Sequence, residues 1–147
     1  MSSIEQSADT LEGLFSGRRG TAMDHIGQGG KGEQFILGYL YEKNSPVTPS
    51  EISDAMRISS ARVSAALGAL EKKGQIIREI DRNNRRNILV TITDSGRDRN
   101  RSNKLRMREF MITVLTEMGE TDSAEFVRLI KRFFEISANR FENDQLN

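Results

Sequence analysis

The chain has 147 residues, 29% of them charged, with a formal net charge of +1, no cysteine and a single histidine, His25. This length suits one domain with a real core, while the lack of cysteine excludes disulfides and thiolate chemistry, and one histidine excludes a histidine-rich metal site within one chain. No apolar run approaches the length of a membrane span and the first ten residues do not resemble a secretory signal, so we expect a cytoplasmic protein with no cofactor, no metal and no membrane contact.

Two helices and a glycine-rich segment are predicted before residue 45. Apolar residues recur at helical spacing in the first helix: Ile4, Ala8, Leu11 and Phe15. Residues 16–32 are rich in glycine and predict a loop or a broken helix. Residues 33–43 predict a helix with an apolar face, which ends before Pro46 because proline disfavours a helical residue in front of it.

The start of the next helix carries the sharpest local signal. Thr48 can cap the helix, Pro49 suits its first position, and Glu51 can reach back to complete a capping box. The apolar face of this short helix is predicted to contain Ile52, Ala55 and Met56. Residues 57–59 predict a tight turn.

The helix after that turn has two different faces. Ser59 or Ser60 can cap it, and Gly74 is placed to end it. Its buried stripe is predicted to hold Val63, Leu67 and Leu70. The opposite face carries small or basic side chains, which suit a helix that enters a groove closely: Arg62, Ser64, Ala65 and Ala69.

Beyond this helix the pattern changes to β-type. Residues 75–80 and 87–93 are rich in β-branched residues, and the second segment alternates apolar and polar side chains. Residues 81–86, DRNNRR, lie between them and are polar and turn-prone. We therefore predict a β-hairpin with a basic tip.

Two helices are predicted after the hairpin. Thr93 or Asp94 can cap the first, and Asp122 with Glu125 fits a capping box for the second. Residues 139–147 are expected to fray. The predicted apolar stripes comprise Met107, Met111, Val114, Leu115 and Met118 on the first helix, and Phe126, Leu129, Ile130, Phe133 and Phe134 on the second.

The order of helix, short capped helix, turn, small-residue helix and basic hairpin is that of a winged helix-turn-helix. The major groove of B-DNA admits one helix, whose leading residues meet base edges, and a basic hairpin tip can enter an adjacent minor groove. No catalytic residue is predicted. The candidate DNA-binding residues are Thr48, Ser59, Ser60, Arg62, Ser64, Arg82, Arg85 and Arg86.

The distribution of charge is consistent with this interpretation. Residues 57–108 contain fourteen Lys/Arg and five Asp/Glu, a net charge of +9, whereas the rest of the chain has a net charge of −8. A positive middle between negative ends is typical of a protein that binds a polyanion, and a solvated charged face without a partner is the alternative. The arginines between residues 97 and 108 fit either interpretation.

The segment TPSEISDAMRISSARVSAALGALEKKGQIIREIDRNNRRNILVTITDSG resembles the MarR family of winged helix-turn-helix regulators. It shows that family's support helix, recognition helix with an LEKKG end, D-x-x-D-R-R wing and L-T-x-x-G exit, and MGETDSAEFVRLIKRF is similar to its penultimate loop and last helix. The resemblance runs from Glu33 to Arg97 and continues to about Ile136. It implies a homodimer that binds a palindromic operator in double-stranded DNA.

The resemblance also assigns roles and a layout. Asp81 matches the family's first wing aspartate, which implies that Asp81 orients the wing. Arg85 and Arg86 match the two arginines of the wing tip. Asn84 stands where the family often has a second aspartate, which weakens any ion pair that orients a wing arginine. The first helix is short for the family, and the glycine-rich segment after it is unusual.

We therefore expect one MarR-like domain over residues 1–147, mainly α with a small β-hairpin wing (α+β). Residues 33–96 would form the DNA-binding lobe. Residues 1–32 and 97–147 would supply the N- and C-terminal dimerisation helices and the glycine-rich loop.

Several other patterns favour plain structural roles. Residues 27–32 match GxGxxG, but no strand and no βαβ unit surround them, so a loop is favoured over a dinucleotide site. His25 is more typical of a surface position than of a catalytic base. The methionine and phenylalanine stripes favour a dimer core over a ligand site, and packing is favoured over an effector pocket for Tyr39 and Tyr41.

The leading hypothesis is a sequence-specific transcriptional regulator, with repression favoured over activation. A small-molecule effector would modulate it by changing the spacing of its two recognition helices. The alternative is a winged-helix module for protein–protein assembly without sequence-specific DNA binding. An assembly module does not need a basic wing. An enzyme is disfavoured, because the chain has no cysteine, one histidine and no predicted metal cluster.

Overall fold

The computed structural model describes residues 2–16 and 32–146, without the side chains of residues 15 and 16. The chain divides into two compact units, which are considered separately. One joins α1 (Ser3–Ser16) to the residues from Arg106 onward, and the other contains the described residues from Gly32 to Leu105. The predictions for the glycine-rich segment and for His25 lie outside the described residues.

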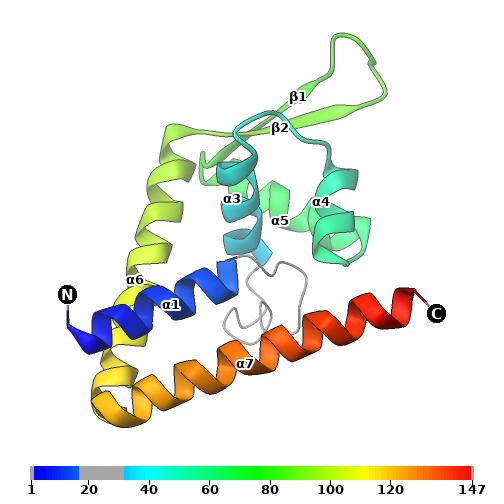
Figure 1. The fold of residues 1–147 in the computed structure, drawn as a ribbon. Coiled ribbons are helices and arrows are strands. Elements are labelled where there is room, and N and C mark those ends of the chain that lie inside the picture. Colours follow the sequence, from blue (N-terminus) through cyan, green and yellow to red (C-terminus); the bar gives the residue numbers. More distant parts are fainter. Residues whose placement is uncertain (1, 17–31, 147) are drawn as a thin grey trace. The chain divides into compact units, whose positions relative to one another are not determined.

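The second of these units is a winged helix-turn-helix, as the sequence predicts (Figure 1). Two strands, β1 and β2, form one antiparallel hairpin, which projects past the helices as the wing. The elements are α3 (Gly32–Lys43), α4 (Pro49–Met56), α5 (Ser60–Lys72), β1 (Ile76–Ile80), β2 (Ile88–Ile92) and the first part of α6 (Asp94–Met118).

Helix α4 begins at the predicted capping box. The Thr48 hydroxyl oxygen accepts a hydrogen bond from the Glu51 backbone N–H (3.2 Å), and the Glu51 carboxylate accepts one from the Thr48 N–H (2.7 Å). Two of the N–H groups that a helix start leaves without a partner are thereby satisfied. The helix ends at Arg57, which adopts the left-handed conformation with φ of 55°.

One apolar core joins the three helices to the hairpin. The predicted stripe of α5 is buried, and the core also receives residues from α3, α4 and both strands. Its buried members are Ile36, Leu37, Leu40, Val47, Ile52, Met56, Val63, Leu67, Leu70, Ile76, Val90 and Ile92. Burial of this apolar area is the main term that holds α5 and the wing base in fixed relation.

The hairpin register decides which side chains reach this core. Ile76 pairs with Ile92 and Arg78 with Val90, so these residues lie on the face that packs against the helices. Val47 adds a short bridge to Val90 at the edge of β2. The core therefore supports the base of the wing.

The junction between the wing and α6 is closely packed. The Thr93 hydroxyl accepts a hydrogen bond from the Gly96 N–H (3.1 Å) and donates one to the Gly74 carbonyl (2.6 Å). A Cβ atom at Gly96 would lie 2.1 Å from the Gln75 carbonyl oxygen, so only glycine fits there. Of the two caps that the sequence predicts for α6, the structure therefore uses Thr93.

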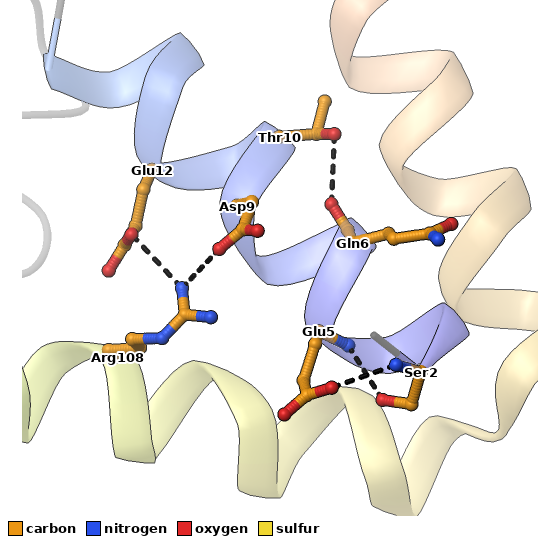
Figure 2. Close-up of polar contacts among 7 residues, drawn as sticks. All are labelled: Ser2, Glu5, Gln6, Asp9, Thr10, Glu12 and Arg108. Carbon is orange, nitrogen blue, oxygen red and sulfur yellow. Dashed lines mark hydrogen bonds and ion pairs between the residues drawn. The ribbon is translucent and has the colours of Figure 1, made fainter.

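The other unit contains α1, the end of α6 and α7 (Glu120–Gln145). Its core holds Ile4, Ala8, Leu11, Leu115 and Val127. Polar contacts add to this packing, as Figure 2 shows: the Arg108 guanidinium on α6 contacts the carboxylates of Asp9 (2.5 Å) and Glu12 (3.1 Å) on α1. The pKa of Arg108 is raised, chiefly by the hydrogen bond to Asp9.

The start and the end of α7 differ from the predictions. The capping box at Asp122 and Glu125 is wrong, because α7 already begins at Glu120 and Gly119 caps it without a side chain. The Glu125 carboxylate instead binds the Arg128 guanidinium at 2.6 and 3.0 Å. The tail is also not frayed, since α7 continues to Gln145.

Within the described residues, none of the helices is both long and apolar enough to cross a membrane.

Candidate nucleic-acid interface

The start of α5 presents the predicted recognition residues. Ser59 is the N-cap, with its hydroxyl oxygen accepting a hydrogen bond from the Arg62 backbone N–H at 3.3 Å. Ser60, Arg62 and Ser64 are exposed, whereas Val63 between them is fully buried. Because Val63 anchors the helix in the core, Arg62 and Ser64 are held on the outer face.

The turn in front of α5 has a support that no sequence pattern predicts. The Ser53 hydroxyl on α4 donates a hydrogen bond to the Ile58 carbonyl oxygen at 2.7 Å. Together with the left-handed Arg57, this bond fixes the short connection between the two helices. A serine inside a helix gives no sign in the sequence of a partner five residues away.

Thr48 and Ser59 are both occupied as caps. Each hydroxyl oxygen accepts a backbone N–H, at 3.2 and 3.3 Å respectively, and each O–H can still donate. Capping and a hydrogen bond to a phosphate oxygen are therefore compatible at these two positions.

The wing tip is a backbone-ordered loop over residues 81–87. The Asp81 N–H donates to the Asn87 carbonyl and the Asn87 N–H to the Asn84 carbonyl, both at 2.9 Å. The Asp81 carboxylate accepts from the Asn83 N–H (2.9 Å), and the Asn84 side-chain oxygen accepts from the Arg86 N–H (3.3 Å). These side chains order the main chain of the tip.

The three arginines of the tip are turned to solvent. Arg82, Arg85 and Arg86 are exposed, and no carboxylate of the described residues lies within ion-pair distance of them. Asp81 in particular holds a backbone N–H and makes no ion pair with an arginine of the tip. The wing therefore presents an uncompensated positive charge.

The base of the wing is tied to the end of the recognition helix. Arg78 on β1 binds the Glu71 carboxylate on α5 through two nitrogens, at 3.0 and 3.2 Å. This hydrogen bonding lowers the pKa of Glu71 and raises that of Arg78. A two-point contact constrains direction as well as distance, so it helps to set the angle between α5 and the wing. Neither residue stands out in the sequence as part of a site.

The basic segment continues into α6. The charged groups of Arg97, Arg101 and Lys104 lie 5.2–6.0 Å from the ring centre of Tyr41 on α3. Arg97 also donates to the Asn44 side-chain oxygen at 2.8 Å. Tyr39 and Tyr41 both pack against the core of this unit.

One unit of the chain thus brings together a capped helix start and a basic hairpin. Donors and cations dominate both surfaces, which is the chemistry that phosphates and base edges require. Among the described residues no group of acidic or histidine side chains is arranged to hold a metal ion.

Comparison with known proteins agrees with this geometry. Residues 33–111 match the family described as winged helix DNA-binding domain. An HTH-type transcriptional regulator of Bacillus subtilis, YdgJ, is 34% identical over 97 residues, which cover 66% of this chain. The chain spans 58% of the length of that relative.

Solved structures extend the similarity to the fold. MepR, a transcription regulator of the Staphylococcus aureus multidrug efflux pump MepA, has a TM-score of 0.62 at 22% identity, covering 90% of this chain and 88% of its own. MepR in complex with DNA has a TM-score of 0.53 at 24% identity, covering 69% and 78%. The chain therefore belongs to the winged helix DNA-binding domain family and has the fold of MarR-type transcriptional regulators.

Proposed function

We propose that the protein is a transcriptional repressor that binds a palindromic operator as a homodimer. The observation that carries this proposal is the pairing, in one compact unit, of an exposed Arg62 and Ser64 on a capped helix with three exposed arginines on the wing. In a winged helix these two surfaces contact the major groove and the flanking minor groove. The existence of a MepR–DNA complex supports DNA as the partner.

Exposed apolar side chains support the homodimer. The unit formed by α1, the end of α6 and α7 leaves large apolar residues exposed on two helices: Met107, Phe110 and Val114 on α6, and Phe126, Leu129, Phe133, Ile136 and Phe141 on α7. Phe133 is 66% exposed and Phe110 63%. Patches of this kind are rarely left open in a soluble monomer, and a two-fold interface between copies would bury them.

Modulation by a small-molecule effector completes the proposal. A dimer reads two half-sites about one helical turn apart, so a ligand that changes the separation of the recognition helices weakens binding. MepR regulates a multidrug efflux pump, which supports a ligand-responsive role for a chain of the same fold. A panel of aromatic and cationic compounds, screened for release of the operator at micromolar concentration, would identify the effector.

The proposal is tested by fluorescence anisotropy with the purified protein. The duplex upstream of the protein's own gene is compared with an unrelated duplex, at several salt concentrations. A specific regulator should prefer its own fragment by about a thousandfold or more, with a steep dependence on salt. Equal and weak binding of both duplexes would contradict the proposal and favour a protein-assembly module.

Two charge variants sharpen this experiment. Arg85→Ala/Arg86→Ala should weaken binding and reduce the salt slope by about one unit for each phosphate that the variant no longer neutralises. Arg128→Ala/Lys131→Ala removes the same charge from α7, where both residues are exposed, and should leave the slope unchanged. An equal effect of the two pairs would show that only net charge matters.

A further inference from the structure

The wing carries exposed isoleucines behind its arginines. Ile80 and Ile88 form the last pair of the β1–β2 ladder, directly before the loop of residues 81–87. Ile80 is 66% exposed and Ile88 43%. Large apolar side chains at the loop end of this hairpin lie outside the core, so this pair needs another explanation.

The register shows why the pair is exposed. Directly paired residues share a face of an antiparallel hairpin, and alternate residues return to that face. Ile80 and Ile88 therefore lie on the face of Ile76 and Val90, which packs against the helices, but beyond the end of the core. The hairpin projects past the helices in Figure 1, so the far end of this face extends beyond the core that covers its base.

We propose that Ile80 and Ile88 form an apolar contact with the deoxyribose walls of the minor groove, next to the phosphates and bases that the wing arginines bind. This inference rests on the proposed DNA-binding function and adds an apolar contact surface to it. The sugars that line a minor groove expose carbon-bound hydrogens, and proteins that bind this groove combine arginine with apolar side chains such as isoleucine. The charge around the pair fits that partner, since the loop that it supports carries Arg82, Arg85 and Arg86 without bound carboxylates.

The same hairpin offers a matched control. Ile77 lies on β1 and is 47% exposed, but it pairs with Thr91 on the opposite face of the hairpin. Ile77→Thr therefore removes the same side-chain atoms from β1 as the Ile80→Thr change of the double variant does. If the contact depends on the face of the hairpin and not on its general hydrophobicity, the variant at Ile80 and Ile88 will weaken DNA binding and the variant at Ile77 will not.

The test measures operator affinity at several salt concentrations for Ile80→Thr/Ile88→Thr and Ile77→Thr. Threonine keeps the β-branched shape that strands favour, and thermal melting followed by circular dichroism checks that each variant folds. The double variant should bind roughly five- to twentyfold more weakly, because it buries less apolar surface in the groove. Its salt dependence should run parallel to that of the wild type, since every phosphate-binding residue is retained. Ile77→Thr should bind within about twofold of the wild type.

Other outcomes overturn the inference. If the wild type binds its operator with a steep salt slope while both isoleucine variants bind equally well, the proposed function stands and the apolar contact does not exist. If Ile80→Thr/Ile88→Thr abolishes a self-association seen by sedimentation without weakening DNA binding, the pair docks a second copy of the chain. If the double variant does not fold, Ile80→Val/Ile88→Val is used in its place. Its operator affinity should be about two- to fourfold lower than that of the wild type.

Discussion

Ser59 caps α5, and we propose that it also contacts the operator; substitutions can separate these two roles. Its hydroxyl oxygen caps α5 through the Arg62 N–H, and its O–H can donate to a phosphate oxygen. Ser59→Ala should lower the free energy of unfolding by about 1 kcal/mol and also weaken operator binding. Ser59→Asp should keep the cap and the stability, but repel a phosphate and weaken binding. Urea unfolding and anisotropy measure the two effects, and full operator affinity in Ser59→Asp would remove Ser59 from the interface.

Arg62 is the residue with the greatest expected effect on sequence preference. It is a long donor exposed at the start of α5, held in place by the buried Val63 beside it. Arg62→Ala should cost about 1–3 kcal/mol of operator binding and relax the preference at one position of each half-site. Lys72→Ala, exposed in the last turn of the same helix, is the control. Binding to operators with single base changes measures the loss, and an unchanged preference at every position would assign Arg62 to the phosphate backbone.

At the scale of elements, the Glu71–Arg78 ion pair helps to set the angle between α5 and the wing. The hydrogen bond to Arg78 lowers the pKa of Glu71 from its ordinary value of 4.5. The stabilising effect of the pair is therefore complete above pH 4.5 and is lost as the pH falls through the lowered value. Glu71→Gln should lower the urea midpoint at neutral pH, and the difference from the wild type should vanish in strong acid. Glu79→Gln, on the other face of the same strand, should show no such convergence.

The predictability of each element follows from how local its determinants are. The α4 cap lies within four consecutive residues, so Thr48 and Glu51 were identifiable from the sequence. The start of α7 was not, because a glycine with φ of 89° caps it and Ser123 binds the Leu115 carbonyl eight residues earlier. For the site, the wing arginines stand out as a local cluster. The Glu71–Arg78 bond and the exposure of Ile80 depend on strand register and on where the core ends, which no short pattern reveals.

At the scale of the whole molecule, we expect operator binding to depend on dimerisation. Phe133 is 66% exposed on α7, and burial between two copies would stabilise a dimer by about 2 kcal/mol for each such side chain. Phe133→Asp should give a monomer in sedimentation and lower operator affinity at least a hundredfold, while helix content stays unchanged. Ala124→Asp is the control, because helical geometry places it on the far side of α7 from Phe133. A dimeric Phe133→Asp would exclude this face from the interface.

Sequence-specific binding by two recognition helices, related by a two-fold axis, is the basis of the proposed function. The decisive experiment selects duplexes from a random pool with the purified protein and sequences those that bind. We expect enrichment of one palindromic site whose half-sites are about ten base pairs apart from centre to centre, flanked by A·T-rich positions where the wings lie. A pool that shows no enriched site after repeated selection, although the protein is folded and dimeric, would contradict sequence-specific binding.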